Sequence, residues 1–198
     1  ISRSKKKDIR KAGSGNLGAS NAKVLFGWKA GIAVAVHDIG KAAIAVILAK
    51  LFFPELTYGG AAAGVAAVMG HIFPFYLGFK GGKGVAVMAG FAFGYHWSFI
   101  PSSILLFFVP YLTTKFVSLG SLMVYGGTFI QMIIEGQMGI FGAVRQANLI
   151  EMYLIQFFLT FMAYYRHRAN IGRLLSGNER KTYLFKTNSE KLDLGDKK

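Results

Sequence analysis

Long apolar blocks, separated by short polar segments, constrain the fold of this chain more than any other feature. The blocks approach or exceed the length of a membrane span and contain few charges, which is typical of transmembrane helices, since about twenty apolar residues cross a bilayer as a helix. We therefore predict an all-α fold, a polytopic integral membrane helical bundle. The blocks are Val24–Phe53, Ala61–Leu77, Val85–Leu112, Leu119–Ile134 and Leu149–Tyr164.

The charge of the chain is concentrated outside these blocks. The 198 residues carry a formal net charge of +14, and most lysines and arginines lie in the polar segments. A nucleic-acid-binding domain would instead place them along one face of a soluble fold, so the pattern favours a membrane surface. The chain has no cysteine, which excludes disulfides, thiolate metal sites and a cysteine nucleophile. No cluster of His, Asp and Glu has metal-ligand spacing, and we predict no metal and no cofactor.

The block Val85–Leu112 is too long for one simple span. His96-Trp97-Ser98 and the nearby Pro101 favour a tight hairpin near its middle, with short helices over about 85–96 and 99–114. With this division the chain contains six spans. The other four cover about 24–53, 60–77, 120–135 and 149–165.

The distribution of basic residues supports the division. With six spans, nearly all lysine and arginine falls on one side of the membrane, and the other side has only Arg145. The positive-inside rule places the basic side in the cytoplasm. The cytoplasmic segments are then residues 1–23, Lys80–Lys83, Lys115–Ser121 and the tail from Arg166, and the opposite ones are Pro54–Gly59, His96–Ser98 and Glu135–Asn148.

We interpret residues 1–198 as a single domain. It consists of a cytoplasmic substrate loop (1–23), a transmembrane bundle (24–165) and a cytoplasmic tail (166–198). The chain opens with Ile1, and the basic run Ser2–Lys7 is typical of the flank of an earlier segment. We therefore expect that residues, and with them a helix, are missing before Ile1.

Glycine and lysine are concentrated in the segment Lys80–Gly84, between two apolar blocks. Glycine allows a tight turn that exposes N–H groups, and such a nest beside a helix start suits phosphate. A basic turn at a membrane surface explains the same residues without a ligand, and the stretch alone does not decide between the two. It is not a Walker A loop, because Leu77 occupies the position of the first glycine and Gly84 that of the serine or threonine.

The segment Gly13–Gly18 matches the pattern G-x-G-x-x-G. A dinucleotide site is excluded, because no apolar strand precedes the glycines and no βαβ unit follows. The segment still offers several groups that bind phosphate, and arginine suits bidentate contact. These groups are the Arg10 guanidinium, the Ser14 hydroxyl and the side-chain amides of Asn16 and Asn21.

Two histidines lie near the ends of predicted spans, His71 in or at the end of the second span and His167 where the last span leaves the membrane. Taken alone, His71 is typical of a hydrogen-bonded packing residue, and His167 is typical of a surface residue, a base or a phosphate donor. Neither belongs to an H-x-x-x-x-D acyltransferase dyad, because the fifth residues on are Tyr76 and Gly172. Within the first block, Asp38 and Lys41 are three residues apart and can form an ion pair on one helix face.

Taken together, the motifs are similar to those of the bacterial acyl-phosphate:glycerol-3-phosphate acyltransferases (the PlsY family). The resemblance covers nearly the whole chain in order, and the combination of S-G-N, F-K-G-G-K-G-V-A and H-R-x-N-I-x-R-L is very specific. The matching residues are Asp8–Lys11, Gly13–Asn16, Asn21, Gly70-His71, Phe73-Pro74, Phe79–Ala86, Ser118, His167-Arg168, Asn170-Ile171, Arg173-Leu174, Gly177, Glu179 and Lys181.

The resemblance implies a multi-pass enzyme of the bacterial inner membrane with seven spans and a cytoplasmic active site. It implies transfer of a fatty acyl group from acyl phosphate to the 1-position hydroxyl of glycerol 3-phosphate, giving lysophosphatidic acid and phosphate. The implied partners are these two substrates, the lipid bilayer and, functionally, the enzyme that makes acyl phosphate, with no nucleic acid.

The resemblance also implies roles for individual residues. We hypothesise that Lys83 and the nearby glycine N–H groups hold acyl phosphate, and that Arg10, His167 and Asn170 hold glycerol 3-phosphate. The proton acceptor is either His167 or a substrate phosphate oxygen. The implied catalytic residues are Ser14, Lys83 and His167, and the substrate-binding residues are Arg10, Asn16, Ser20, Asn21, His71, Gly81, Gly82, Gly84, Ser118, Asn170 and Arg173.

The chain departs from the family pattern at a few positions. Ser20 stands where threonine is usual, Lys115-Phe116 where Arg-Tyr is common, and Asp38-Ile39-Gly40-Lys41-Ala42 where the family has D-x-x-K-G. The alternative function is a membrane transporter or channel for a phosphorylated anion. It predicts charges near the middle of the spans, where only His37, Asp38 and Lys41 come close.

Overall fold

The computed structural model describes residues 8–56, 58–142 and 148–183, and every regular element in these ranges is helical. The predicted all-α class is therefore confirmed. The elements are η1 (Ile9–Lys11), α1 (Ala19–Phe26), α2 (Trp28–Phe52), α3 (Gly59–Ile72), η2 (Phe75–Leu77), α4 (Val85–Tyr95), α5 (Phe99–Thr114), α6 (Val117–Gln137), α8 (Leu149–Arg166) and α9 (Arg168–Leu175).

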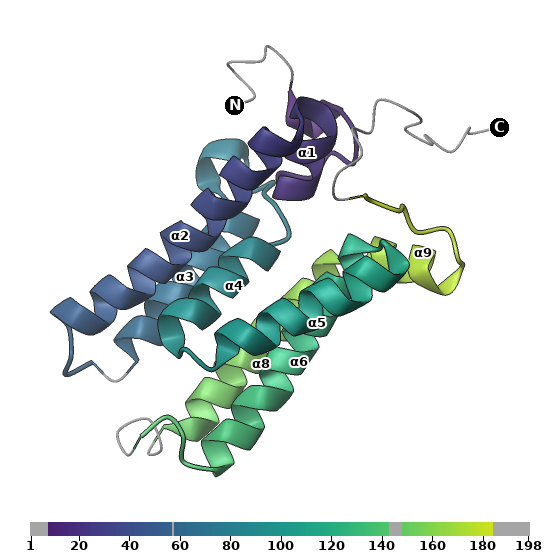
Figure 1. The fold of residues 1–198 in the computed structure, drawn as a ribbon. Coiled ribbons are helices and arrows are strands. Elements are labelled where there is room, and N and C mark those ends of the chain that lie inside the picture. Colours follow the sequence, from purple (N-terminus) through teal and green to yellow (C-terminus); the bar gives the residue numbers. More distant parts are fainter. Residues whose placement is uncertain (1–7, 57, 143–147, 184–198) are drawn as a thin grey trace.

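The long helices form two groups, with α2, α3 and α4 in one and α5, α6 and α8 in the other (Figure 1). Small residues let the backbones of α2 and α4 approach closely. A Cβ atom on Gly90 would lie 2.0 Å from the carbonyl oxygen of Ile39, and one on Gly94 would lie 2.9 Å from that of Ala43. Glycine at such contacts is typical of helix packing in membranes, where van der Waals contact drives association.

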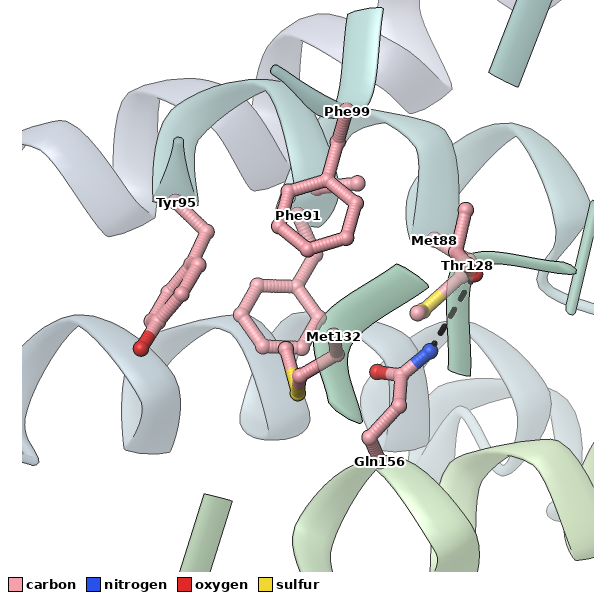
Figure 2. Close-up of a pocket in the computed structure, with 8 residues that line it drawn as sticks. Met88, Phe91, Tyr95, Phe99, Thr128, Met132 and Gln156 are labelled. Atoms are coloured by element: carbon pink, nitrogen blue, oxygen red, sulfur yellow. Dashed lines mark hydrogen bonds between the residues drawn. The ribbon is translucent and has the colours of Figure 1, made fainter. Parts of the chain in front are cut away.

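The two groups meet around a small cavity lined by residues of α4, α5, α6 and α8 (Figure 2). Three of its eight lining residues are aromatic, and the rings of Phe91 and Tyr95 pack edge to face at 5.9 Å. The Gln156 side chain lies among these apolar groups and donates from Nε2 to Oγ1 of Thr128 at 3.3 Å. The core therefore continues from one helix group into the other.

Within the described ranges, three segments are long and apolar enough to cross a membrane: Trp28–Phe52, Gly59–Leu77 and Val117–Gln137. The apolar helices α4 and α5 are shorter, and span about 16 Å and 24 Å against a hydrocarbon core of about 30 Å. Large apolar side chains of α2, such as Ile44 and Leu51, are more than half exposed, as a lipid-facing surface requires. The total of six spans stays a prediction.

The predicted hairpin in the longest block is confirmed, because α4 ends at Tyr95 and α5 begins at Phe99. The predicted helix start at Val24 is wrong. A short helix, α1, already begins at Ala19 and ends at Phe26. The next residue, Gly27, has a φ of +89°, which interrupts the helix before α2. Glycine takes this backbone conformation at little cost, so the break separates α1 from the span.

Other boundaries also differ from the prediction. The predicted loop Lys115–Ser121 contains only two residues outside helices, because α6 begins at Val117. Helix α6 continues to Gln137, past the expected end at about 135, and the tail contains the unpredicted helix α9. Arg145 and the ranges 1–7 and 184–198, on which part of the topology and domain prediction depends, lie outside the described residues.

Candidate active site

The segment Lys80–Gly84, called the lysine loop below, folds back against the end of α3. The Gly81 N–H donates to the carbonyl oxygen of Ile72 at 3.0 Å, and the Gly82 N–H donates to that of His71 at 3.2 Å. A Cβ atom on Gly81 would lie 2.0 Å from the His71 carbonyl oxygen. Glycine is required here for close approach, and these two N–H groups are already donated. The hypothesis that they hold phosphate therefore needs correction.

Lys83 extends from the lysine loop to α9, where its Nζ donates to Oδ1 of Asn170. Burial lowers the pKa of Lys83 to about 8, because an ammonium group loses hydration there. The carboxylate of Glu179 raises this pKa, and Arg173 and Arg166 lower it further. Lys83 is thus a partly desolvated cation, held by a neutral partner that leaves its charge available.

Glu179 contacts three of the predicted residues at this end of the bundle. Its Oε1 accepts from the Ser118 hydroxyl at 3.0 Å and from Nδ2 of Asn170 at 2.7 Å. Its Oε2 accepts from Nε of Arg173 at 2.8 Å, and the carboxylate is only 6% exposed. Sequence reasoning placed Glu179 in a family motif but assigned it no role. Because it receives three donors, it fixes the partner of Lys83.

The segment that carries Glu179 returns across the bundle after α9. The Thr182 N–H donates to the carbonyl oxygen of Lys115, in the turn between α5 and α6, at 2.9 Å. One residue later, the carbonyl oxygen of Tyr183 accepts from Nζ of Lys23 in α1. Residues 176–183 therefore link the second helix group to α1, and the two ends of the described chain meet on the same side (Figure 1).

His167 is buried at the junction of α8 and α9, with 2% of its surface exposed. Its Nδ1 lies 2.8 Å from the carbonyl oxygen of Ala163. Because a carbonyl can only accept, we assign the hydrogen to Nδ1, which leaves a lone pair on Nε2. Burial, and then the charge of Lys83, lower the pKa of His167 to about 4. The side chain is therefore neutral near pH 7.

Arg166 is a site residue that sequence reasoning missed. Its Nη2 donates to the carbonyl oxygens of Gly81 and Gly82 at 3.2 and 3.3 Å, and its guanidinium lies over the Phe73 ring at 5.9 Å. The residue therefore fixes the lysine loop to the end of α8. Its sequence signal, a cation directly before His167, is also typical of any cytoplasmic span end.

The N-terminal loop, residues 8–18, is organised by Asn21 in α1. The Asn21 Nδ2 donates to the carbonyl oxygens of Ile9, Ala12 and Asn16, each at 3.1 Å, and its Oδ1 accepts from the Ser14 N–H at 3.0 Å. Asn21 is 3% exposed. Its polar atoms hold the loop, which is a structural role that the sequence prediction did not include.

Arg10 is paired within this loop. Its Nη2 lies 2.9 Å from Oδ2 of Asp8, and this hydrogen bonding lowers the pKa of the Asp8 carboxyl to about 2. Ser14 and Ser20 are exposed, and the Ser14 hydroxyl accepts from the Asn16 N–H at 3.4 Å. In the described part of the chain, no hydrogen bond joins these side chains to Lys83.

The two loops meet at His71. A Cβ atom on Gly82 would lie 2.2 Å from Nε2 of His71 and 3.0 Å from the carbonyl oxygen of Leu17, in the N-terminal loop. On the other side of the lysine loop, Gly84 has a φ of +81° and turns the chain into α4. No group of three or more His, Asp or Glu residues within the described ranges could hold a metal ion.

The fold and the site define a class, a helical membrane protein that gathers cations, amides and two histidines at one end of its bundle. Similarity to known proteins is more specific. A sequence model of the glycerol-3-phosphate acyltransferase family matches residues 1–177. The chain belongs to the glycerol-3-phosphate acyltransferase family.

Relatives and solved structures support this assignment. The chain is 37% identical over 175 residues to a glycerol-3-phosphate acyltransferase of Macrococcus caseolyticus, covering 88% of this chain and 83% of the relative. It is 39% identical over 178 residues to that of Bacillus velezensis, covering 90% and 85%. The crystal structure of PlsY in its glycerol 3-phosphate form, an integral membrane acyltransferase, matches 96% of this chain and 90% of its own, with a TM-score of 0.83 at 30% identity. The lysophosphatidic acid form matches with a TM-score of 0.79.

Proposed function

We propose that this protein transfers a fatty acyl group from acyl phosphate to the 1-position hydroxyl of glycerol 3-phosphate. The products are lysophosphatidic acid and inorganic phosphate. Family membership supports the acceptor, and the related PlsY crystal structures are of a glycerol 3-phosphate form and a lysophosphatidic acid form. The observation that carries the proposal is the buried network in which Lys83 contacts Asn170, which is itself fixed by Glu179.

The network suits a reaction between two phosphorylated molecules. The glycerol hydroxyl attacks the carbonyl carbon, the new ester C–O bond forms, and the bond from that carbon to the phosphate oxygen breaks. Negative charge develops on the carbonyl oxygen and then on the leaving phosphate. Lys83 stabilises this charge, because a partly desolvated, pre-positioned cation interacts with it more strongly than water does.

The remaining predicted residues have supporting roles in this proposal. Arg10 and Asn16 bind substrate phosphate from the N-terminal loop, with the exposed hydroxyls of Ser14 and Ser20 beside them. Arg173 and Ser118 act through Glu179, which both contact. Gly81 and Gly82 shape the lysine loop rather than donate to the ligand.

For the proton, we favour a substrate phosphate oxygen as the acceptor. His167 has a lone pair on Nε2 that can accept a hydrogen bond from the glycerol hydroxyl and orient it. Its pKa of about 4 makes it a weak base, whereas a phosphate monoester takes up a proton near pH 6. In this scheme His167 positions the nucleophile and the phosphate takes the proton.

We further propose that the protein lies in the bacterial inner membrane with its site in the cytoplasm, on the side that carries most of the basic residues. Acyl phosphate would then come from a cytoplasmic enzyme. The cations described above gather at one end of the bundle, which favours the enzyme over the transporter alternative.

A direct assay tests the proposed donor and acceptor. Purified full-length protein in lipid vesicles receives labelled glycerol 3-phosphate with either acyl phosphate, acyl-coenzyme A or an acylated carrier protein. We expect lysophosphatidic acid only with acyl phosphate, and we expect the ester at the 1-position. Turnover with either thioester alone would refute the proposed donor, and flux of intact glycerol 3-phosphate without chemistry would favour the transporter.

A further inference from the structure

A cluster of three ionisable side chains lies beside the site, between α2 and α3. The Lys41 Nζ lies 2.6 Å from Oδ1 of Asp38, on the same helix, and 2.9 Å from Nδ1 of His71, on α3. The His71 Nδ1 is 3.5 Å from the same carboxylate oxygen. Asp38 is 5% exposed, so the pair predicted from the spacing of Asp38 and Lys41 is a buried carboxylate with two neighbours.

This geometry fixes the hydrogen of the His71 ring. A lysine ammonium group has three donors and no acceptor, so the Nδ1 atom that faces it must supply a lone pair. A protonated His71 would instead place two cations 2.9 Å apart, with two donors facing each other. We therefore assign the ring hydrogen to Nε2 and the acceptor lone pair to Nδ1.

The Nε2 atom faces the site. It lies against Gly82 of the lysine loop, close to the Leu17 carbonyl of the N-terminal loop, so its N–H is at the junction of the two segments that carry the phosphate-binding groups. His167 has the opposite arrangement, with its hydrogen on Nδ1 and a lone pair on Nε2. The two histidines thus supply the site with one donor and one acceptor.

We propose that Asp38 and Lys41 are positioning residues that hold His71 as an Nε2–H donor to a substrate phosphate group. Asp38 orients the Lys41 ammonium, which donates a hydrogen bond to Nδ1 of His71. The ring proton is thereby kept on Nε2, the nitrogen that faces the two loops. The phosphate belongs either to acyl phosphate or to glycerol 3-phosphate. This inference rests on the proposed function for its substrates, but the tautomer does not depend on activity.

Nitrogen-15 NMR of the full chain, labelled at histidine and held in lipid nanodiscs, tests the tautomer directly. The His71 signals are those that disappear in His71→Gln. We expect an unprotonated Nδ1 and a protonated Nε2 in the unsubstituted protein, a mixture of tautomers in Lys41→Met, and the original pattern in Lys41→Arg, which retains a donor-only cation. A proton on Nδ1 in the unsubstituted protein overturns the proposal, whether or not the two Lys41 variants fold.

Kinetics then test the consequence for the substrates. We expect Lys41→Met to raise the KM of at least one of the two phosphorylated substrates about tenfold, the effect of one lost hydrogen bond to a charged group, with a smaller change in kcat. The substrate whose KM rises more identifies the phosphate that His71 contacts. Lys29→Met, which removes an exposed lysine of the same helix, is the matched control and should leave both constants unchanged.

The outcomes separate this inference from the proposed function. A changed His71 spectrum with both KM values unchanged overturns the positioning role. Recovery of KM in Lys41→Arg together with the original His71 tautomer supports it, because arginine keeps a donor-only cation at Nδ1. Absence of lysophosphatidic acid formation by the unsubstituted protein would refute the proposed function and leave the NMR result standing.

Discussion

Two carboxylates make contacts at opposite ends of helix α6, and they have different partners. Glu135, near the end of α6, accepts from the Ser98 hydroxyl at 2.6 Å and from Nε2 of Gln131 at 2.7 Å. Glu179 accepts from Ser118, at the start of α6, about 26 Å away along the helix, and from Asn170 and Arg173. Glu135 joins the turn between α4 and α5 to α6, and Glu179 joins the segment after α9 to α6.

The difference lies in the cations. The partners of Glu135 given above are neutral, and they close the turn between α4 and α5. Glu179 contacts Arg173 directly and reaches Lys83 through Asn170. Partly buried cations lose hydration, so an end of the bundle that gathers them gives up stability relative to a neutral network. We infer that the Glu135 end is structural and that the Glu179 end is built for an anionic ligand.

The largest fall in activity expected from this comparison follows from replacing Lys83. Lys83→Met removes the cation that faces the substrates, and we expect kcat/KM to fall by about 10³ because one pre-positioned donor is lost. The measurement is lysophosphatidic acid formation in vesicles. Lys80→Met, which removes an exposed lysine of the same loop, should change activity less than threefold, roughly 0.6 kcal/mol. Equal losses in both variants would contradict a special role for Lys83.

A paired substitution tests the comparison itself. Glu179→Gln removes the charge that holds Arg173 and leaves Asn170 less constrained, so we expect kcat/KM to fall about 10²-fold. Glu135→Gln should lower the unfolding temperature by a few degrees with activity within about threefold. Both variants are assayed for turnover and thermal unfolding. If folded Glu135→Gln lost as much activity as Glu179→Gln, the division between the two ends would be wrong.

The pKa of Lys83, which lies at the Glu179 end, predicts that kcat/KM depends on pH. The ammonium form is present below about pH 8 and is lost as the pH rises through this value. We therefore expect kcat/KM to fall about tenfold between pH 7 and pH 9, from the change in protonated fraction. Lys83→Arg keeps its charge over this range, and its residual activity should be flat. A parallel fall in Lys83→Arg would assign the titration to another group.

The smallest expected effect concerns stability. His167 has a pKa of about 4 in the folded protein and about 6.5 when unfolded, so the unfolded state binds more protons between these values. Stability from this group is complete above pH 6.5 and falls as the pH is lowered toward 4. His167→Asn keeps a donor for the Ala163 carbonyl and does not titrate. Its unfolding temperature should drop less between pH 7 and pH 5 than that of the unsubstituted protein.

Much of this arrangement could be predicted from the sequence. Apolar block lengths and the distribution of lysine and arginine gave the helical class and the split of Val85–Leu112, because both follow from the bilayer as solvent. The grouping of Lys83 with Asn170 and Ser118 also followed from the motifs. Spacing along the chain could not show that Gly81 and Gly82 donate to the end of α3, since that depends on how the loop folds back.

Two roles that sequence reasoning missed, those of Arg166 and Glu179, depend on contacts between residues far apart in the chain. Arg166 meets Gly81 across 85 residues, and Ser118 meets Glu179 across 61. Asn21 was assigned to the substrate because its loop matched a motif, whereas its side chain is used to hold that loop. Gly27 carried a signal for the break between α1 and α2, since glycine is the residue that commonly adopts a positive φ at the end of a helix.

The return of residues 176–183 across the bundle has a consequence for how the protein is made. Lys83 leaves the ribosome 87 residues before Asn170, which is roughly 4 to 17 seconds at ordinary rates of synthesis, and Glu179 follows later still. During that interval the lysine loop is present without the groups that fix it. The nascent chain therefore remains inactive through insertion of its earlier helices, and its site closes only when the last segment arrives.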